Sequence, residues 1–388
     1  MIVYDFDTIH NRNTAGDIKY EPIKGAENVI PMWVADMDFK TATCVETAVK
    51  KVAEKGIYGY QAADDAYLGS VQSWYGRRFS FDIQKNWIVP SPAVMYSAAC
   101  AIRALTREDD AVLIFEPVYY PFSNVIRSNR RRLVISDLKN INGHYEIDFD
   151  DFEKKIRENR VKALLFCSPH NPVGRVWTKS ELEKVAQICL ENEVAIISDE
   201  IHSDLVFAPH RHIPIASLSA DIAARTVTCV APTKTFNLAA IEASNMIIAD
   251  DRIRRSVQQE MRANCQMGVN AFGIAATKAV YADGEGWLQE LLDYLDESRK
   301  ILTKAFPKGA KTSAVLPEGT SLAWLDCRRL GLSDNELYDL LLYKAGVRLH
   351  KGGTFGKSGE GFMRLNFACP HSVLKDAIDR IKAVQIDL

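Results

Sequence analysis

Short, almost uninterrupted runs of apolar residues alternate with helical patterns through the middle of this chain. Residues 163–167 and 194–198 are two such runs, and a helical pattern at residues 180–192 separates them. A strand that faced solvent on one side would alternate apolar and polar residues, so these runs indicate strands that are buried on both faces. The alternation predicts an α/β fold with a mainly parallel central sheet covered by helices.

The composition is that of an ordinary globular protein. The 388 residues are 47% hydrophobic and 25% charged, with a net charge of −2, which gives no support for a nucleic-acid or membrane partner. The eight cysteines contain no pair at metal-ligand spacing, so we expect no metal site. Cysteines within apolar runs, together with the lack of a signal peptide or membrane span, lead us to expect a cytoplasmic protein.

The pattern of the sequence changes near residue 284. Residues 285–388 begin with a long amphipathic helix and continue with mixed strands and helices, in place of the regular alternation seen before. We predict a large domain at residues 43–284 and a smaller α+β domain at residues 285–388. Residues 1–42 are irregular and are expected to form an N-terminal arm that contributes to the small domain.

Polar side chains follow the ends of several predicted strands. Asn171 follows one buried strand, Asp199 and His202 end the next, and Lys234 comes after a β-branched run. Each residue alone is more simply explained as a turn residue, or in the case of Lys234 as a surface lysine. Ligands bind at the carboxyl ends of strands in open α/β sheets, so the four together predict a site. A desolvated lysine there would have a lowered pKa and a nucleophilic amine.

The turn at residues 91–97 is a candidate phosphate site. A short strand precedes it and a helix rich in small residues follows it, an arrangement that presents backbone amides to an anion. Many turns of this kind bind nothing, so the signal is weak when it is taken alone. It gains weight only beside the polar residues at the strand ends.

Four motifs together resemble the fold-type I enzymes that use pyridoxal 5′-phosphate (PLP). They are HNPVGRVW at 170–177, SDEIHSD at 198–204, APTKTFN at 231–237 and MRLNFACP at 363–370. With WVADMDF at 33–39 and EGT at 318–320, the chain is more closely similar to the cystathionine β-lyase (MalY/PatB, C–S lyase) branch of the aminotransferase superfamily. The resemblance covers essentially the whole chain.

The resemblance implies a role for each residue at the strand ends. Lys234 would hold PLP covalently and carry the Cα proton of the substrate. Asp199 would pair with the pyridine nitrogen and keep it protonated, because an opposite charge in contact favours the cationic form. Asn171 would donate a hydrogen bond to the phenolic oxygen of the ring, and His202 would lie near that oxygen.

The resemblance also assigns the remaining contacts. The two faces of the PLP ring would be covered by Tyr119 and Ile201. The phosphate would be bound by backbone amides and a hydroxyl group, from Ala93, Val94, Met95 and Thr233. The substrate carboxylate would form a bidentate pair with Arg364, and other substrate contacts would come from Ala35, Tyr119 and Asn171. Tyr60 would reach the phosphate of a neighbouring subunit, so a homodimer with shared active sites is expected.

Three residues depart from the pattern of the family. Ala93 and Ala240 stand where glycine is usual, and Glu242 stands where many aminotransferases have an arginine that binds the phosphate. The absence of that arginine favours a lyase over an aminotransferase. The predicted function is a C–S β-lyase that acts on L-cystathionine or a related L-cysteine S-conjugate, with a PLP-dependent aminotransferase and a PLP-binding transcriptional modulator as alternatives.

Overall fold

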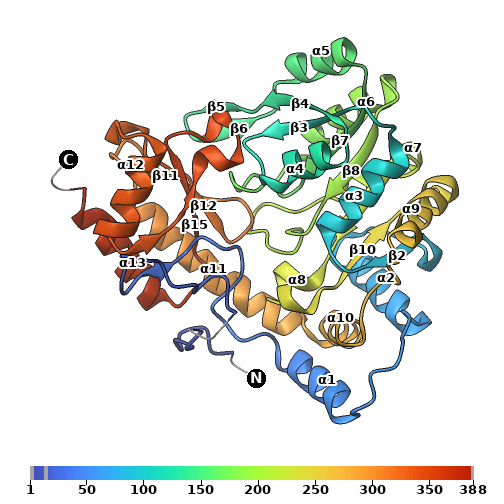
Figure 1. Ribbon diagram of the computed structural model, residues 1–388, viewed down its shortest axis with the longest axis horizontal. Coiled ribbons are helices and arrows are strands. Elements are labelled where there is room, and N and C mark those ends of the chain that lie inside the picture. Colours follow the sequence, from blue (N-terminus) through green and yellow to red (C-terminus); the bar gives the residue numbers. More distant parts are fainter. Residues whose placement is uncertain (1–3, 13–15, 386–388) are drawn as a thin grey trace.

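A seven-stranded sheet forms the centre of the structure, a computed structural model that describes residues 4–12 and 16–385 (Figure 1). The order of its strands is β2 (Ile88–Ser91), β10 (Ser244–Ile247), β9 (Thr226–Val230), β8 (Ala195–Asp199), β7 (Val161–Cys167), β3 (Ala111–Glu116) and β4 (Arg132–Asp137). Neighbouring strands from β9 to β4 are parallel, whereas β10 is antiparallel to both β9 and β2. The predicted mainly parallel sheet is confirmed. Residues 1–3 and 13–15 of the predicted arm and residues 386–388 of the predicted small domain lie outside the described residues.

Both faces of this sheet are covered by helices. Alternate residues of β3 point to opposite sides: Val112 and Ile114 pack with α3 (Val94–Leu105), α4 (Pro121–Ser128) and α9 (Asp251–Ala263). Leu113 and Phe115 pack with α5 (Phe149–Asn159) and α6 (Lys179–Glu191). All residues of β3 are therefore buried, which explains why the strand shows no polar alternation.

Beside the β2 end of the sheet (Figure 1), helix α10 (Ala271–Asp283) packs against both α1 (Thr43–Glu54) and α2 (Asp65–Phe79). The ends of α2 are set by its sequence, because the Asp64 side chain accepts from the backbone N–H of Tyr67 and Ser80 ends the helix in a left-handed conformation. The shorter elements are α7 (Ala220–Ala223), α8 (Pro232–Thr235), and the hairpin of β5 (Lys139–Ile141) and β6 (His144–Glu146). None of the helices in the described residues has both the length and the apolar character needed to cross a membrane.

A second, antiparallel sheet lies in the C-terminal part of the chain. Its strand order is β11 (Ser313–Ala314), β12 (Leu322–Asp326), β15 (Phe362–Asn366) and β14 (His350–Lys351). The helices of this region are α11 (Glu285–Ala305), α12 (Asp334–Asp339) and α13 (His371–Ala383). Helix α12 ends at Asp339, and the chain continues as a π-helical turn, Leu340–Lys344.

The N-terminal arm is tied to this C-terminal region. Strand β1 (Ile30–Pro31) pairs in parallel with β13 (Val347–Arg348), and the backbone N–H of Asn366 donates to the carbonyl of Met32. The blue N-terminal segment accordingly lies beside the orange and red part of the chain (Figure 1). This places residues 33–39 between β15 and the segment that carries Lys234.

Candidate active site

A cavity of about 400 Å³ opens at the carboxyl ends of β7 and β8, and β15 lines one of its sides. A second cavity, of about 440 Å³, lies between the β5–β6 hairpin and residues 308–329 and contains no predicted site residue. The first cavity brings together every predicted site residue except Tyr60, namely Ala35, Ala93, Val94, Met95, Tyr119, Asn171, Asp199, Ile201, His202, Thr233, Lys234 and Arg364.

Lys234 lies in α8, directly after β9, and its amine faces the N-terminal arm. Its Nζ donates a hydrogen bond to the carbonyl oxygen of Ala35 over 2.6 Å. Protein groups take the place of water around much of the amine, and this desolvation lowers the pKa of Lys234 to about 8. A substantial fraction of the amine is then neutral near physiological pH, which is the form that acts as a nucleophile or base.

Asp199 ends β8 and is almost fully buried, at 5% exposure. Its Oδ1 accepts a hydrogen bond from the backbone N–H of Ile201 over 3.1 Å. Burial raises the pKa of Asp199 to about 7, because a carboxylate away from water needs a positive partner to stay ionised. A ligand with a basic ring nitrogen opposite this carboxyl group would supply that partner.

Arg364 lies on β15 and is held in the cavity by three groups. Its Nη1 donates to Oδ1 of Asn171 (3.1 Å), and its Nη2 donates to the carbonyl oxygen of Trp33 (2.8 Å). The third group is Nδ1 of His350, 3.5 Å from Nη2. Burial and the charge of Arg364 lower the pKa of His350 to about 3, so this histidine is neutral beside the guanidinium group. The fixed guanidinium suits a carboxylate ligand.

The helix α3 presents its N-terminal turn to the same cavity. Ala93 precedes the helix, and no side chain caps its first backbone amides, so Val94 and Met95 belong to a turn whose amides are open to an anion. Ala93 has φ −156°, an extended conformation that does not require glycine. Glu242, in contrast, lines the cavity with φ +55°, which is in the left-handed region that favours glycine. The buried residue Thr233 adds a hydroxyl group.

Some residues of the cavity were missed by the sequence analysis. They are His350 and Tyr120, and the cavity is also lined by Trp33 of the motif at residues 33–39. His350 is directly opposite Arg364 in the β14–β15 ladder. A pairing register of this kind leaves no local pattern in the sequence, so only the fold could reveal the histidine.

Tyr60 lies outside the cavity and is fully exposed, as are its neighbours Ile57 and Tyr58 to a large extent. Its predicted contact with the phosphate of a second subunit therefore stays a prediction. In the part of the chain that the structure describes, no group of three or more His, Cys, Asp or Glu side chains could hold a metal ion.

Comparisons with known proteins agree with this geometry. The family model for aminotransferase class I and II matches residues 27–381. The chain is 38% identical to the cystathionine β-lyase PatB of Bacillus subtilis, over 98% of this chain and 99% of the relative. It is 30% identical to protein MalY of Escherichia coli, over 99% of this chain and 100% of the relative.

Solved structures give the same result. Cystalysin from Treponema denticola, which contains a PLP cofactor, superposes with a TM-score of 0.96 at 34% identity and covers 100% of both chains. The PLP-bound C–S lyase from Staphylococcus hominis superposes with a TM-score of 0.92 at 33% identity and covers 99% of both chains. The predicted fold and the resemblance are confirmed: the chain belongs to the aminotransferase class I and II family and, within it, to the MalY/PatB branch.

Proposed function

We propose that this protein is a PLP-dependent carbon–sulfur β-lyase, which converts L-cystathionine or a related L-cysteine S-conjugate into a thiol, pyruvate and ammonia. The observation that carries the proposal is the meeting of a desolvated Lys234 and a buried Asp199 in one cavity. The chain that builds this cavity is 38% identical to a cystathionine β-lyase over nearly its whole length.

The residues of the cavity fit PLP at each of its functional groups. The open amides at the start of α3 and the hydroxyl group of Thr233 suit the phosphate, and the carboxyl group of Asp199 suits the ring nitrogen. Nδ1 of His202 is buried and has no hydrogen-bond partner within the described chain. Such buried polar atoms normally have a partner, and the polar edge of a bound PLP ring would provide one.

The residues of the chain would divide the reaction among them. Bound PLP supplies an electron sink that makes the Cα proton of the substrate acidic. Arg364 binds the substrate carboxylate and fixes its orientation, because the guanidinium group is itself held by Asn171 and the Trp33 carbonyl. The neutral amine of Lys234 removes the Cα proton. The carbon–sulfur bond at Cβ then breaks, and its electron pair leaves with the sulfur as a thiolate.

An aminotransferase would use the same cavity up to removal of the Cα proton, and the family model includes such enzymes. The two functions are separated by their products. We expect the purified protein with PLP and L-cystathionine to release pyruvate and a free thiol in equal amounts, measured by a lactate dehydrogenase assay and a thiol reagent. Amino transfer that depends on an added keto acid, without thiol release, would contradict the lyase.

We also propose that the active protein is a homodimer, in which Tyr60 of one subunit completes the phosphate site of the other. The full exposure of Tyr60 and the exposed side chains of Ile57 and Tyr58 support this proposal.

The proposed domain division is an arm (1–42), a large domain (43–284) and a small domain (285–388). The seven-stranded sheet and the four-stranded sheet, which are separate, support it. The eight free cysteines, six of them buried, support a cytoplasmic location.

Mixed dimers test the sharing of the site. Lys234→Ala should inactivate the homodimer. Tyr60→Ala should weaken its activity and lower its affinity for PLP by about 10-fold or more, because a hydrogen bond to a charged group is removed. A heterodimer of the two variants, purified through two different tags, contains one site with both residues intact. We expect it to recover about half of the activity of the unmodified dimer. No recovery would show that Tyr60 does not act across subunits.

A further inference from the structure

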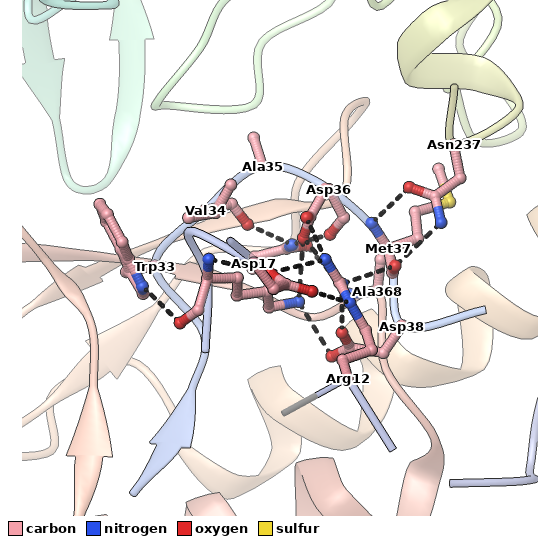
Figure 2. Close-up of polar contacts among 12 residues, drawn as sticks. Arg12, Asp17, Trp33, Val34, Ala35, Asp36, Met37, Asp38, Asn237 and Ala368 are labelled. Carbon is pink, nitrogen blue, oxygen red and sulfur yellow. Dashed lines mark hydrogen bonds and ion pairs between the residues drawn. The ribbon is translucent and has the colours of Figure 1, made fainter. Parts of the chain in front are cut away.

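A network of five charged side chains lies beneath the loop of residues 33–39 (Figure 2). Arg12 donates from Nη1 to Oδ1 of Asp38 and from Nη2 to Oδ2 of Asp36, both over 2.7 Å, and from Nε to Asp17 over 3.0 Å. Lys19 pairs through Nζ with Asp38 at 2.9 Å and with Asp36 at 3.2 Å. The network joins the start of the N-terminal arm, at residues 12–19, to the loop further along the same arm.

Lys19 is the most deeply buried member, with 2% of its surface exposed. A buried ammonium group is tolerated only when it is paired, so the two aspartates and the lysine depend on one another. Burial alone would raise the pKa of Asp36. The hydrogen bonds and charges of Arg12 and Lys19 outweigh burial and hold this pKa below its usual range. Asp36 is therefore an ionised and largely neutralised carboxylate.

The loop held by this network is fixed from two other directions as well. Asn237, three residues after Lys234, accepts from the backbone N–H of Met37 (3.0 Å) and donates to the carbonyls of Met37 and Phe39, both over 2.9 Å (Figure 2). On the opposite side, Nδ2 of Asn366 donates to the carbonyl oxygen of Val34 over 2.7 Å. The loop is thus hydrogen-bonded to the segment that carries Lys234 and to the end of β15.

Two backbone carbonyls of the same loop contact the two cations of the cavity. The carbonyl of Ala35 accepts from Nζ of Lys234 (2.6 Å), and the carbonyl of Trp33 accepts from Nη2 of Arg364 (2.8 Å). Asp36 directly follows Ala35, so its charge acts on the amine from the arm side. The negative charges of Asp36 and Asp199, the latter on β8, raise the pKa of Lys234, whereas the positive charge of Arg364 on β15 lowers it. His202 is neutral.

We propose that Arg12 and Lys19 are positioning residues for Lys234: they fix the loop whose Ala35 carbonyl contacts the amine, and they offset the negative charge of Asp36. The charge offset keeps the amine reactive near neutral pH. Without either cation, Asp36 would present an uncompensated charge next to the loop and favour the ammonium form of Lys234. The importance of this effect for catalysis rests on the proposed function, whereas the protonation of Lys234 is a property of the chain itself.

Labelling of Lys234 by cyanate tests this inference without the cofactor. Cyanate reacts with the neutral amine, so the initial rate of carbamylation of the Lys234 peptide, measured by mass spectrometry on the full chain freed of PLP, reports the protonation of Nζ against pH. We expect the labelling of the unmodified protein to reach half of its maximum rate near pH 8. Arg12→Met and Lys19→Met should move this midpoint upward by about one unit.

The controls separate charge from loosening of the loop. Arg12→Lys and Lys19→Arg keep the charge and should leave the midpoint near that of the unmodified protein. Asp36→Asn should move it downward, and Arg12→Met combined with Asp36→Asn should bring it back toward the original value. Arg328→Met removes an arginine from the remote pair with Asp326 and should have no effect on the midpoint.

Identical midpoints in Arg12→Met, Lys19→Met, Asp36→Asn and the unmodified protein would overturn the inference. A shift in the same direction for Arg12→Met and Asp36→Asn would also overturn it, because it would indicate a disordered loop rather than an electrostatic effect. If Lys19→Met fails to fold, Arg12→Met and Asp36→Asn carry the test, since both replace partly exposed side chains. The proposed lyase fails separately, if the unmodified protein is carbamylated at Lys234 but shows no lyase reaction.

Discussion

Lys234→Ala should abolish the release of pyruvate from L-cystathionine, with a fall in kcat of about 10⁴-fold or more. The substitution removes both the covalent attachment point for PLP and the base that takes the Cα proton, and proton transfer alone contributes about 10²- to 10⁴-fold. The measurement is a single-turnover assay on protein saturated with PLP. Borohydride reduction before digestion should label the peptide of residues 231–237 in the unmodified protein and leave the variant unlabelled.

The exposed lysine Lys304, in the last turn of α11, provides a matched control. Lys304→Ala should retain full activity and labelling. An added small amine, such as methylamine, should restore part of the rate to Lys234→Ala, because it can enter the cavity and take up the proton. Full activity of Lys234→Ala in the absence of an added amine would refute both the assignment of the base and the proposed lyase.

Asp199→Asn should lower kcat by about 10²- to 10³-fold, the usual cost of losing one group that stabilises charge formed during a reaction. An asparagine keeps the shape of the side chain but cannot hold a proton on the ring nitrogen by ionic attraction. PLP should still bind, with a shifted absorption spectrum that reports the loss of the ring proton. Unchanged kcat and an unchanged spectrum would show that Asp199 does not face the ring nitrogen.

The same substitution should stabilise the protein when PLP has been removed. Burial raises the pKa of Asp199 from 3.8 to about 7, so between about pH 4 and pH 7 the folded chain binds a proton that the unfolded chain has released. Stability therefore falls as the pH rises through this window. Asparagine has no such dependence, so the melting temperature of Asp199→Asn should exceed that of the PLP-free unmodified protein by a margin that grows from about pH 5 to about pH 7 and then levels off.

A gap that stays constant with pH would mean that Asp199 is ionised even without PLP. With PLP added in excess, the order should reverse, because the unmodified protein binds the cofactor more tightly and gains more stability from it. A difference in melting temperature that changes sign when PLP is added would show that the Asp199 carboxyl group destabilises the PLP-free fold and is retained for the reaction.

Most of the central sheet could be predicted from the sequence, because most of its strands contain runs of apolar or β-branched residues. The exception is β10, which was missed because it begins with two polar residues, Ser244 and Asn245. Both are fully buried. Their partners are Ser91 of β2, 2.6 Å from the hydroxyl oxygen of Ser244, and the hydroxyl group of Tyr67, which donates to Asn245 over 3.0 Å. These partners lie more than 150 residues away in the chain, so no local pattern could identify the strand.

The cavity residues at the ends of strands were predictable for a related reason. Asn171, Asp199 and Lys234 each follow a recognisable strand, and the carboxyl ends of parallel strands meet at one edge of the sheet. The network of Arg12, Lys19 and Asp36 was not predictable, because scattered charges near the start of a chain look like a solvated surface. Their burial becomes visible only when the arm is placed against β15.

The position of the arm has a consequence for how the protein is made. The carbonyl oxygen of Asp36 accepts a hydrogen bond from Asn366, 330 residues away, and β1 pairs with β13. During translation, residues 33–39 leave the ribosome long before those partners exist. The loop that supports the active lysine is therefore completed only when synthesis is nearly finished, so a nascent chain cannot acquire working catalytic machinery before its last strand has emerged.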